Sequence, residues 1–256
     1  MIGYAIERSD GVATFWIDRP EKKNSLTLEI LDGLDGLIAS VQTDDSCNII
    51  VVRGRGGIFS SGFDLSTLSG GPQHTSVAAT RAAEVFDRLA HAPIPSIAVI
   101  EGMATGAGFE LMLATDFAIA ETTARIGEFS IRLAMFGGAG PTYRLPSLIG
   151  IRRTKDLILG GKLISAGTAY EWGLVNEMAD AEALDDTVAG FTGQLLDKSA
   201  YQLGLTKSMI AAGYDAASQP LKLLERFAFD LSCSSRDAQE GIASFLEKRK
   251  PEWRGR

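Results

Sequence analysis

Two short turns rich in small residues are the parts of this 256-residue chain that could do chemistry. The first, residues 59–65, has the sequence FSSGFDL and follows the apolar run at residues 49–52 and a glycine turn. Small side chains let a ligand approach the backbone closely, and successive free N–H groups in such a turn can hold a partial negative charge. Taken alone, this stretch is more typical of an ordinary exit from a strand into a loop.

The second turn, residues 102–110, has the sequence GMATGAGFE and opens a predicted helix. N–H groups in the first turn of a helix lack intrahelical acceptors and lie at the positive end of the helix dipole, so a developing oxyanion would be stabilised there. Glu110 lies in that first turn. An isolated glutamate at this place is most often only helix-favouring. Burial in an apolar pocket would raise its pKa toward values useful for proton transfer.

The composition excludes several classes of protein. There are 25 basic and 32 acidic side chains, and the resulting net charge of −7 disfavours a nucleic-acid-binding surface. The chain has only two cysteines, which lie far apart, and two histidines, so we predict no disulfide framework and no metal site. The motifs GxGxxG after the first strand, GxxxxGK[ST], GxSxG and HExxH are absent.

Hydrophobic periodicity predicts strands and helices in alternation, which is typical of a layered α/β fold with helices outside the sheet. Strands are expected in a hairpin over residues 2–17 and at 49–52, 96–100 and 117–120. Helices are expected at about 27–41, 77–91 and 106–115 and after the small-residue turn at 137–141. Beyond about residue 197 the pattern is helical and ends in a helix with a capping box at Ser234 and Asp237. We therefore divide the chain into a core, 1–196, and a C-terminal helical region, 197–256.

The N-terminal sequence lacks the pattern of a secretory signal, and no apolar run approaches the roughly 20 residues that cross a bilayer. We therefore predict a cytoplasmic enzyme that has no membrane partner.

Together the two turns resemble the crotonase superfamily, the enoyl-CoA hydratase/isomerase family. The motif G-x-G-x-x-F-S-x-G-x-D-L runs from Gly54 to Leu65, and G-x-G-x-E-L follows about forty residues later, from Gly106 to Leu111. The resemblance covers nearly the whole chain. It implies a spiral of stacked ββα units with a C-terminal helical trimerisation region, assembled as a homotrimer or a dimer of trimers.

The resemblance also implies an acyl-CoA substrate and no separate cofactor. The thioester oxygen would be held by the main-chain N–H groups of Phe63 and Ala107, and Glu110 would move the proton. Residues expected to bind the CoA and acyl parts are Lys22, Lys23, Ser25, Ser60, Gly62, Phe63, Asp64, Leu65, Gly106 and Leu133. The basic run 248–250 is a further candidate for the CoA phosphates. The acyl pocket is expected to include Met103, Phe109, Leu133, Met135 and Phe136.

The family's second glutamate falls at Ser130 in this chain. A serine hydroxyl can orient water but is a poor base near neutral pH. Glu128 would share a face with Ser130 if this segment were extended. Because glutamate is rarely buried, we expect Glu128 to lie on the surface.

These residues leave four functions open. Reversible hydration of a 2-enoyl-CoA is placed first, with Glu110 as acid/base and water positioned by Ser130. Isomerisation of an enoyl-CoA, with Glu110 as the single base, is a close second. Hydrolysis of an acyl-CoA thioester is a further alternative. A non-catalytic binding protein is the least favoured, given the acidic charge balance and the presence of Glu110.

Overall fold

The computed structural model describes residues 2–41, 44, 46–68, 72–133, 137–215, 236–237, 240, 244 and 247–254. Its larger sheet has six strands in the order β1-β2-β3-β4-β6-β9. The strands are β1 (Tyr4–Ser9), β2 (Val12–Ile17), β3 (Ile49–Gly54), β4 (Ser96–Ile100), β6 (Phe117–Glu121) and β9 (Glu177–Ala179). The hairpin of β1 and β2 is antiparallel, and every later pairing in this sheet is parallel.

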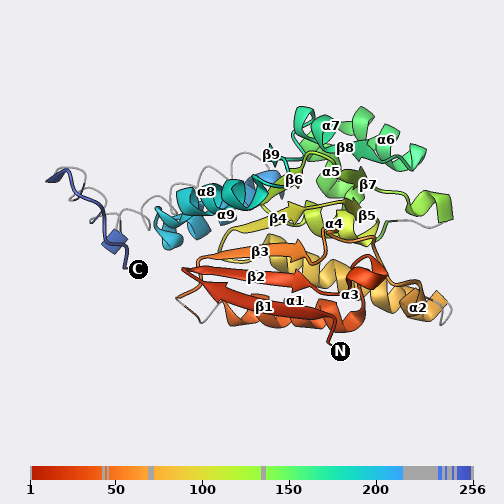
Figure 1. Cartoon of the computed structure of the whole chain (residues 1–256), viewed down its shortest axis with the longest axis horizontal. Helices are drawn as coiled ribbons and strands as arrows, with labels where there is room; N and C mark the ends of the chain where they lie inside the picture. The colour runs from red at the N-terminus through yellow and green to blue at the C-terminus, as the bar shows by residue number, and fades with distance from the viewer. Residues whose placement is uncertain are drawn as a thin grey trace.

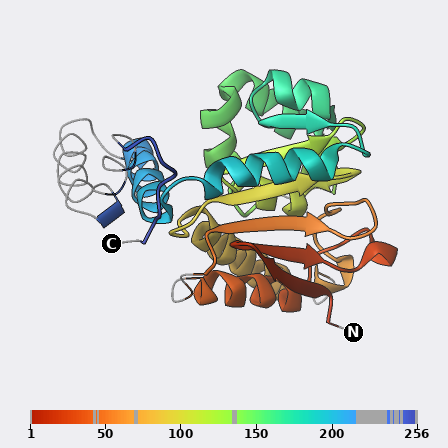
Figure 2. The same cartoon turned by 60° about the vertical axis from the view of Figure 1, so that its left-hand side comes forward.

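Both faces of the larger sheet are covered, which explains why its central strands are apolar without alternation. Ile50 and Val52 face a core shared with α1 (Leu28–Ser40) and α3 (Pro72–Ala90). Ile49 and Val51 face the opposite way, toward α8 (Leu184–Leu196). Figures 1 and 2 show α8 lying along the sheet and α1 and α3 on its other side.

A second, three-stranded sheet has the order β5-β7-β8. Its strands are β5 (Met103–Thr105), β7 (Arg125–Gly127) and β8 (Ile164–Ser165). Helix α4 (Ala107–Leu113) leaves β5 directly, and all seven of its residues are buried. This burial on every side explains the sequence AGFELML, in which Glu110 is the one ionisable residue.

The remaining elements surround these two sheets (Figure 1). They are η1 (Pro20–Lys22), α2 (Leu65–Leu68), η2 (Ser130–Leu133), α5 (Pro141–Ile149), α6 (Ile151–Gly160), α7 (Ala166–Glu171) and α9 (Ala200–Asp215). No helix among the described residues is long and apolar enough to cross a membrane.

Most of the predicted elements are confirmed. The hairpin turns at Asp10 and Gly11, and the Thr27 side chain accepts a hydrogen bond from Ile30 N at the start of α1. Helix α3 begins at Pro72, earlier than the predicted residue 77. The strands of the second sheet and β9 have only two or three residues, too few for a periodic signal.

The C-terminal region is only partly described. Ser234, half of the predicted capping box, lies outside the described residues. Asp237 accepts hydrogen bonds from Ser199 Oγ and from Arg254 N. The division at residue 196 and the trimerisation role of the region beyond it stay predictions.

Candidate functional site

The two turns singled out from the sequence touch one another in the fold. A Cβ atom placed on Gly62 would lie 3.0 Å from Thr105 O and 3.3 Å from Ala107 N. Gly62 has φ +101° and Gly106 has φ +53°, conformations that favour glycine. Gly62 is therefore favoured both by its backbone conformation and by the close approach of the other turn, and Gly106 by its backbone conformation.

Two isolated parallel bridges hold the first turn in place. Ser60 pairs with Ala104, at the edge of the second sheet, and Phe63 pairs with Leu26. In the second bridge Leu26 N donates to Gly62 O at 2.7 Å, and Asp64 N donates to Leu26 O at 2.9 Å. Neither of these hydrogen bonds uses the N–H group of Phe63.

Two main-chain N–H groups remain available where the turns meet. Within the described part of the chain, neither Phe63 N nor Ala107 N donates a hydrogen bond. Ala107 is the first residue of α4, and its N–H has no intrahelical acceptor. Two free main-chain donors on touching turns can bind an oxyanion.

Glu110 lies one helical turn after Ala107 and is only 3% exposed. Its Oε1 accepts a hydrogen bond from Ala139 N at 3.0 Å. Burial raises the pKa of Glu110 to about 7, with a further rise from the charge of Glu128, against the opposing effects of the Ala139 N–H and Arg144. A carboxyl with this pKa can give or take a proton near neutral pH.

The turn at residues 137–140 comes from far along the chain, and it positions Glu110. Arg144, on α5, donates to Ala139 O at 3.0 Å and forms an ion pair with Asp87 on α3. Tyr143 also donates to Asp87, at 3.1 Å. The turn that carries the Ala139 N–H is thereby tied to two helices. Its small residues were visible in the sequence, but nothing local linked them to Glu110.

Glu128 is buried, with 1% of its surface exposed, so the expectation of a surface position is wrong. The segment is not extended at this point: β7 ends at Gly127 and η2 begins at Ser130. Ser130 N donates to Glu128 Oε1 at 2.7 Å, closing a tight turn around the carboxylate. The other oxygen, Oε2, is buried and accepts no hydrogen bond from any residue that the structure describes.

Glu110 and Glu128 converge on Gly137. A Cβ atom placed on Gly137 would lie 3.0 Å from Glu110 Oε1 and 3.4 Å from Glu128 Oε2. The two oxygens are therefore at most 6.4 Å apart, the sum of these distances. The structure thus brings two buried carboxyl groups together, of which the sequence analysis predicted one.

The predicted CoA-binding residues lie on the first turn and beside it. Lys22 and Lys23 are exposed, and no carboxylate among the described residues pairs with either. Asp64 forms an ion pair with Arg19 at 2.8 Å. The Ser66 hydroxyl and, to a lesser extent, Arg19 hold the pKa of Asp64 at about 2. Ser25 Oγ lies within 3.4 Å of the same carboxylate.

Other predicted residues are less favourably placed. Phe109 has no exposed surface and packs in the main core, so its prediction as a pocket wall is wrong. Ser60 also has no exposed surface, and its main-chain N–H and oxygen pair with β5, so its prediction as a CoA-binding residue is wrong as well. The side chains of Leu65 and Leu133, together with Met135 and Phe136, lie outside the described residues. In the basic run 248–250, Arg249 pairs with Glu240 and Lys250 pairs with Asp197.

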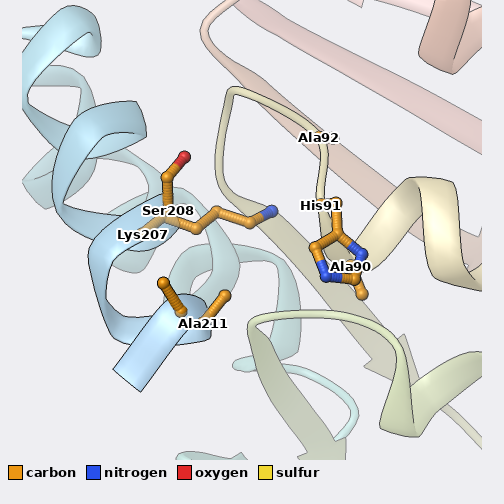
Figure 3. Close-up of a pocket in the computed structure, with 7 residues that line it drawn as sticks. Ala90, His91, Ala92, Lys207, Ser208 and Ala211 are labelled. Atoms are coloured by element: carbon orange, nitrogen blue, oxygen red, sulfur yellow. The ribbon is translucent and has the colours of Figure 1, made fainter. Parts of the chain in front are cut away.

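A pocket of about 200 Å³ lies elsewhere, between the end of α3 and α9 (Figure 3). Lys207 projects into it, and its Nζ donates to Ile94 O at 3.1 Å and to Asp116 Oδ2 at 2.7 Å. The pocket lies at the amino end of β4, whereas Glu110 follows the carboxyl end. Lys207 therefore ties α9 to the sheet. The described residues hold no group of three or more His, Cys, Asp or Glu side chains suited to a metal ion.

Comparisons with known proteins agree with this geometry. The profile of the family described as Enoyl-CoA hydratase/isomerase matches residues 7–256. Crotonyl-CoA hydratase of Syntrophomonas wolfei is 30% identical over 96% of this chain and 95% of its own length. 1,2-Epoxyphenylacetyl-CoA isomerase of Escherichia coli is 32% identical over 96% of both. The solved structure of an enoyl-CoA hydratase from Bacillus anthracis superposes with a TM-score of 0.96 at 29% identity, covering 99% of this chain and 100% of that one.

Proposed function

The chain belongs to the enoyl-CoA hydratase/isomerase family and has its crotonase fold, and on that basis we propose that it adds water reversibly to a 2-enoyl-CoA. One observation carries the proposal. A buried glutamate with a pKa of about 7 lies one helical turn after Ala107, whose free N–H lies where the turn that carries the free N–H of Phe63 touches its own.

The N–H groups of Phe63 and Ala107 bind the thioester oxygen. Negative charge develops on this oxygen as the double bond is attacked, because the electrons of the C=C bond move through the α-carbon into the carbonyl. Donors held in place by the fold stabilise that charge without reorganising, and one such donor contributes about 3–4 kcal/mol to the barrier reduction. The glycines at 62 and 106 keep the backbone of both turns free of side chains where the thioester approaches.

Glu110 moves the proton at the α-carbon. In hydration it gives a proton to this carbon, and in the reverse reaction it takes the proton away. A group whose pKa lies near the working pH does both efficiently. The hydrogen bond from Ala139 leaves one carboxyl oxygen, Oε2, for the substrate.

The exposed Lys22 and Lys23 bind the phosphates of the CoA moiety, and the main chain of residues 61–65 lines its path. No carboxylate among the described residues pairs with these two lysines, whereas Arg249 and Lys250 already pair with carboxylates. Coenzyme A enters as part of the substrate, and we assign no resident cofactor. A homotrimer or dimer of trimers in the cytoplasm remains our prediction for the assembly and its location.

Double-bond isomerisation is the second candidate, because Ser130 stands where the family's second glutamate is expected. A single base can remove a proton from one carbon of a 3-enoyl-CoA and return it to another, with no water consumed.

The test compares crotonyl-CoA, longer 2-enoyl-CoAs and a 3-enoyl-CoA as substrates for the wild type and Glu110→Gln. We expect hydration of 2-enoyl-CoAs by the wild type and a loss of about 10²–10⁴-fold in the variant. Activity on the 3-enoyl-CoA alone would contradict hydration and support isomerisation as the function. Equal rates for both proteins would remove Glu110 from the mechanism.

A further inference from the structure

We propose that Glu128 is the second acid/base group of this site, and that it binds and deprotonates the water that adds to the β-carbon. The inference rests on the proposed hydration. Glu128 thereby holds the water that was expected to be positioned by Ser130, and in addition accepts its proton.

The carboxylate of Glu128 is buried, and one of its oxygens has no hydrogen-bond partner among the described residues. Taking a carboxylate out of water is costly unless hydrogen bonds replace those it loses. Glu128 is 1% exposed, and only its Oε1 is satisfied within the described chain, by Ser130 N at 2.7 Å. A buried acceptor left open in this way needs a donor, and a water molecule is the donor that hydration consumes.

The free carboxylate oxygen of Glu128 also lies close to the carboxyl group of Glu110. The open Oε2 of Glu128 points to the same place as Oε1 of Glu110, since both lie within 3.4 Å of a Cβ position on Gly137. Glycine at 137 adds no side chain there. Two carboxyl groups at most 6.4 Å apart can act on one substrate between them, one at the α-carbon and the other at the β-carbon.

Ser130 holds Glu128 in place through its main chain. The structure gives its main-chain N–H a clear task, the hydrogen bond that fixes Oε1 of Glu128. Any residue except proline supplies that N–H. We therefore assign Ser130 a positioning role that its hydroxyl does not determine.

The step balances without another reactant. Water gives one proton to Glu128 as its oxygen bonds to the β-carbon. The electrons of the C=C bond move to the α-carbon, which receives a proton from Glu110. Glu128 then returns its proton to Glu110 through water, and both groups are restored. Removing and returning an α-proton, in contrast, requires only Glu110 and the two N–H groups.

Hydration should therefore depend on Glu128, whereas exchange of the α-proton should not, and the experiment compares the two reactions. Glu128→Gln keeps the size of the side chain and an oxygen that accepts the Ser130 N–H. Each protein is assayed for hydration of crotonyl-CoA and for deuterium uptake from D2O at the α-carbon of butanoyl-CoA. We expect hydration by Glu128→Gln to fall about 100-fold or more, with deuterium uptake kept within about threefold. Retained uptake shows that the variant is folded and that its oxyanion site is intact.

The matched control is Glu171→Gln, the same substitution at an exposed side chain on α7, and it should hydrate within about threefold of the wild type. Ser130→Ala, which removes the hydroxyl and leaves the N–H, should lose far less hydration than Glu128→Gln. Glu110→Gln should lose both reactions. Normal hydration by Glu128→Gln, or a large loss in Ser130→Ala, would overturn the assignment of Glu128 and leave the hydratase standing. A wild type that exchanges deuterium but does not hydrate would overturn the hydratase and this inference with it.

Discussion

The burial of Glu110 should make the protein less stable as the pH rises, and Glu110→Gln should relieve that loss. Folding raises the pKa of this carboxyl from 4.5 to about 7, chiefly through desolvation. Between these values the folded state binds more protons than the unfolded state. The linkage relation then requires the free energy of unfolding to fall as the pH increases through this window.

The size of the effect follows from the two pKa values. The Glu110 contribution falls by about 2 kcal/mol between pH 5.5 and pH 8.5, because the carboxyl is mostly protonated in the folded protein at the lower pH and ionised at the higher. Glutamine does not titrate, and its oxygen can still accept the Ala139 N–H. The stability of Glu110→Gln relative to the wild type should therefore rise by about 2 kcal/mol across the same interval.

Urea unfolding at equal protein concentration measures this difference at both pH values. The control is Glu171→Gln, which removes the same charge from an exposed side chain on α7 and should show no comparable change. A wild-type-to-variant difference that stays constant from pH 5.5 to 8.5 would refute the link between the burial of Glu110 and its proton affinity. Glu110→Gln should therefore gain stability relative to the wild type as the pH rises and should be nearly inactive, since the carboxyl that is costly to bury is the one that moves the proton.

Two further predictions concern the surroundings of Glu110. Deuterium uptake at the α-carbon requires the ionised carboxylate, so its rate should rise as the pH passes through about 7, and Arg144→Gln should move this midpoint to higher pH, because the Arg144 charge lowers the pKa of Glu110. An unchanged midpoint in Arg144→Gln would contradict the effect of the Arg144 charge on the pKa of Glu110. Gly137→Ala should lower hydration about tenfold or more, because its methyl group would lie 2.8 Å from Pro141 Cγ and 3.0 Å from Glu110 Oε1, so that the carboxyl must move. Gly138→Ala, whose nearest contact is 3.5 Å away, is the control, and equal losses in both variants would show that the turn itself had been disturbed.

Features that depend on neighbouring residues in the chain could be predicted from the sequence. The glycines at 62 and 106 set backbone conformations that few other residues adopt, and Thr27 and the apolar spacing after it set the start of α1. The Asp-Gly turn at residues 10–11 and the apolar runs were sufficient to predict the hairpin and the main parallel strands, whereas the two N–H donors were predicted from the resemblance to the crotonase superfamily. The two- and three-residue strands of the second sheet could not be predicted in this way, because they form only by pairing across the fold.

The environment of the ionisable groups, in contrast, depends on contacts between distant parts of the chain. Glu110 and the Ala139 N–H that holds it are 29 residues apart, and Arg144 reaches the same turn from another helix. Glu128 was expected on the surface because glutamate is usually found there, yet the turn closed by Ser130 N buries it beside Glu110. Desolvation and charge coupling depend on every group packed around a carboxyl, from whatever part of the chain, and local spacing carries no record of them.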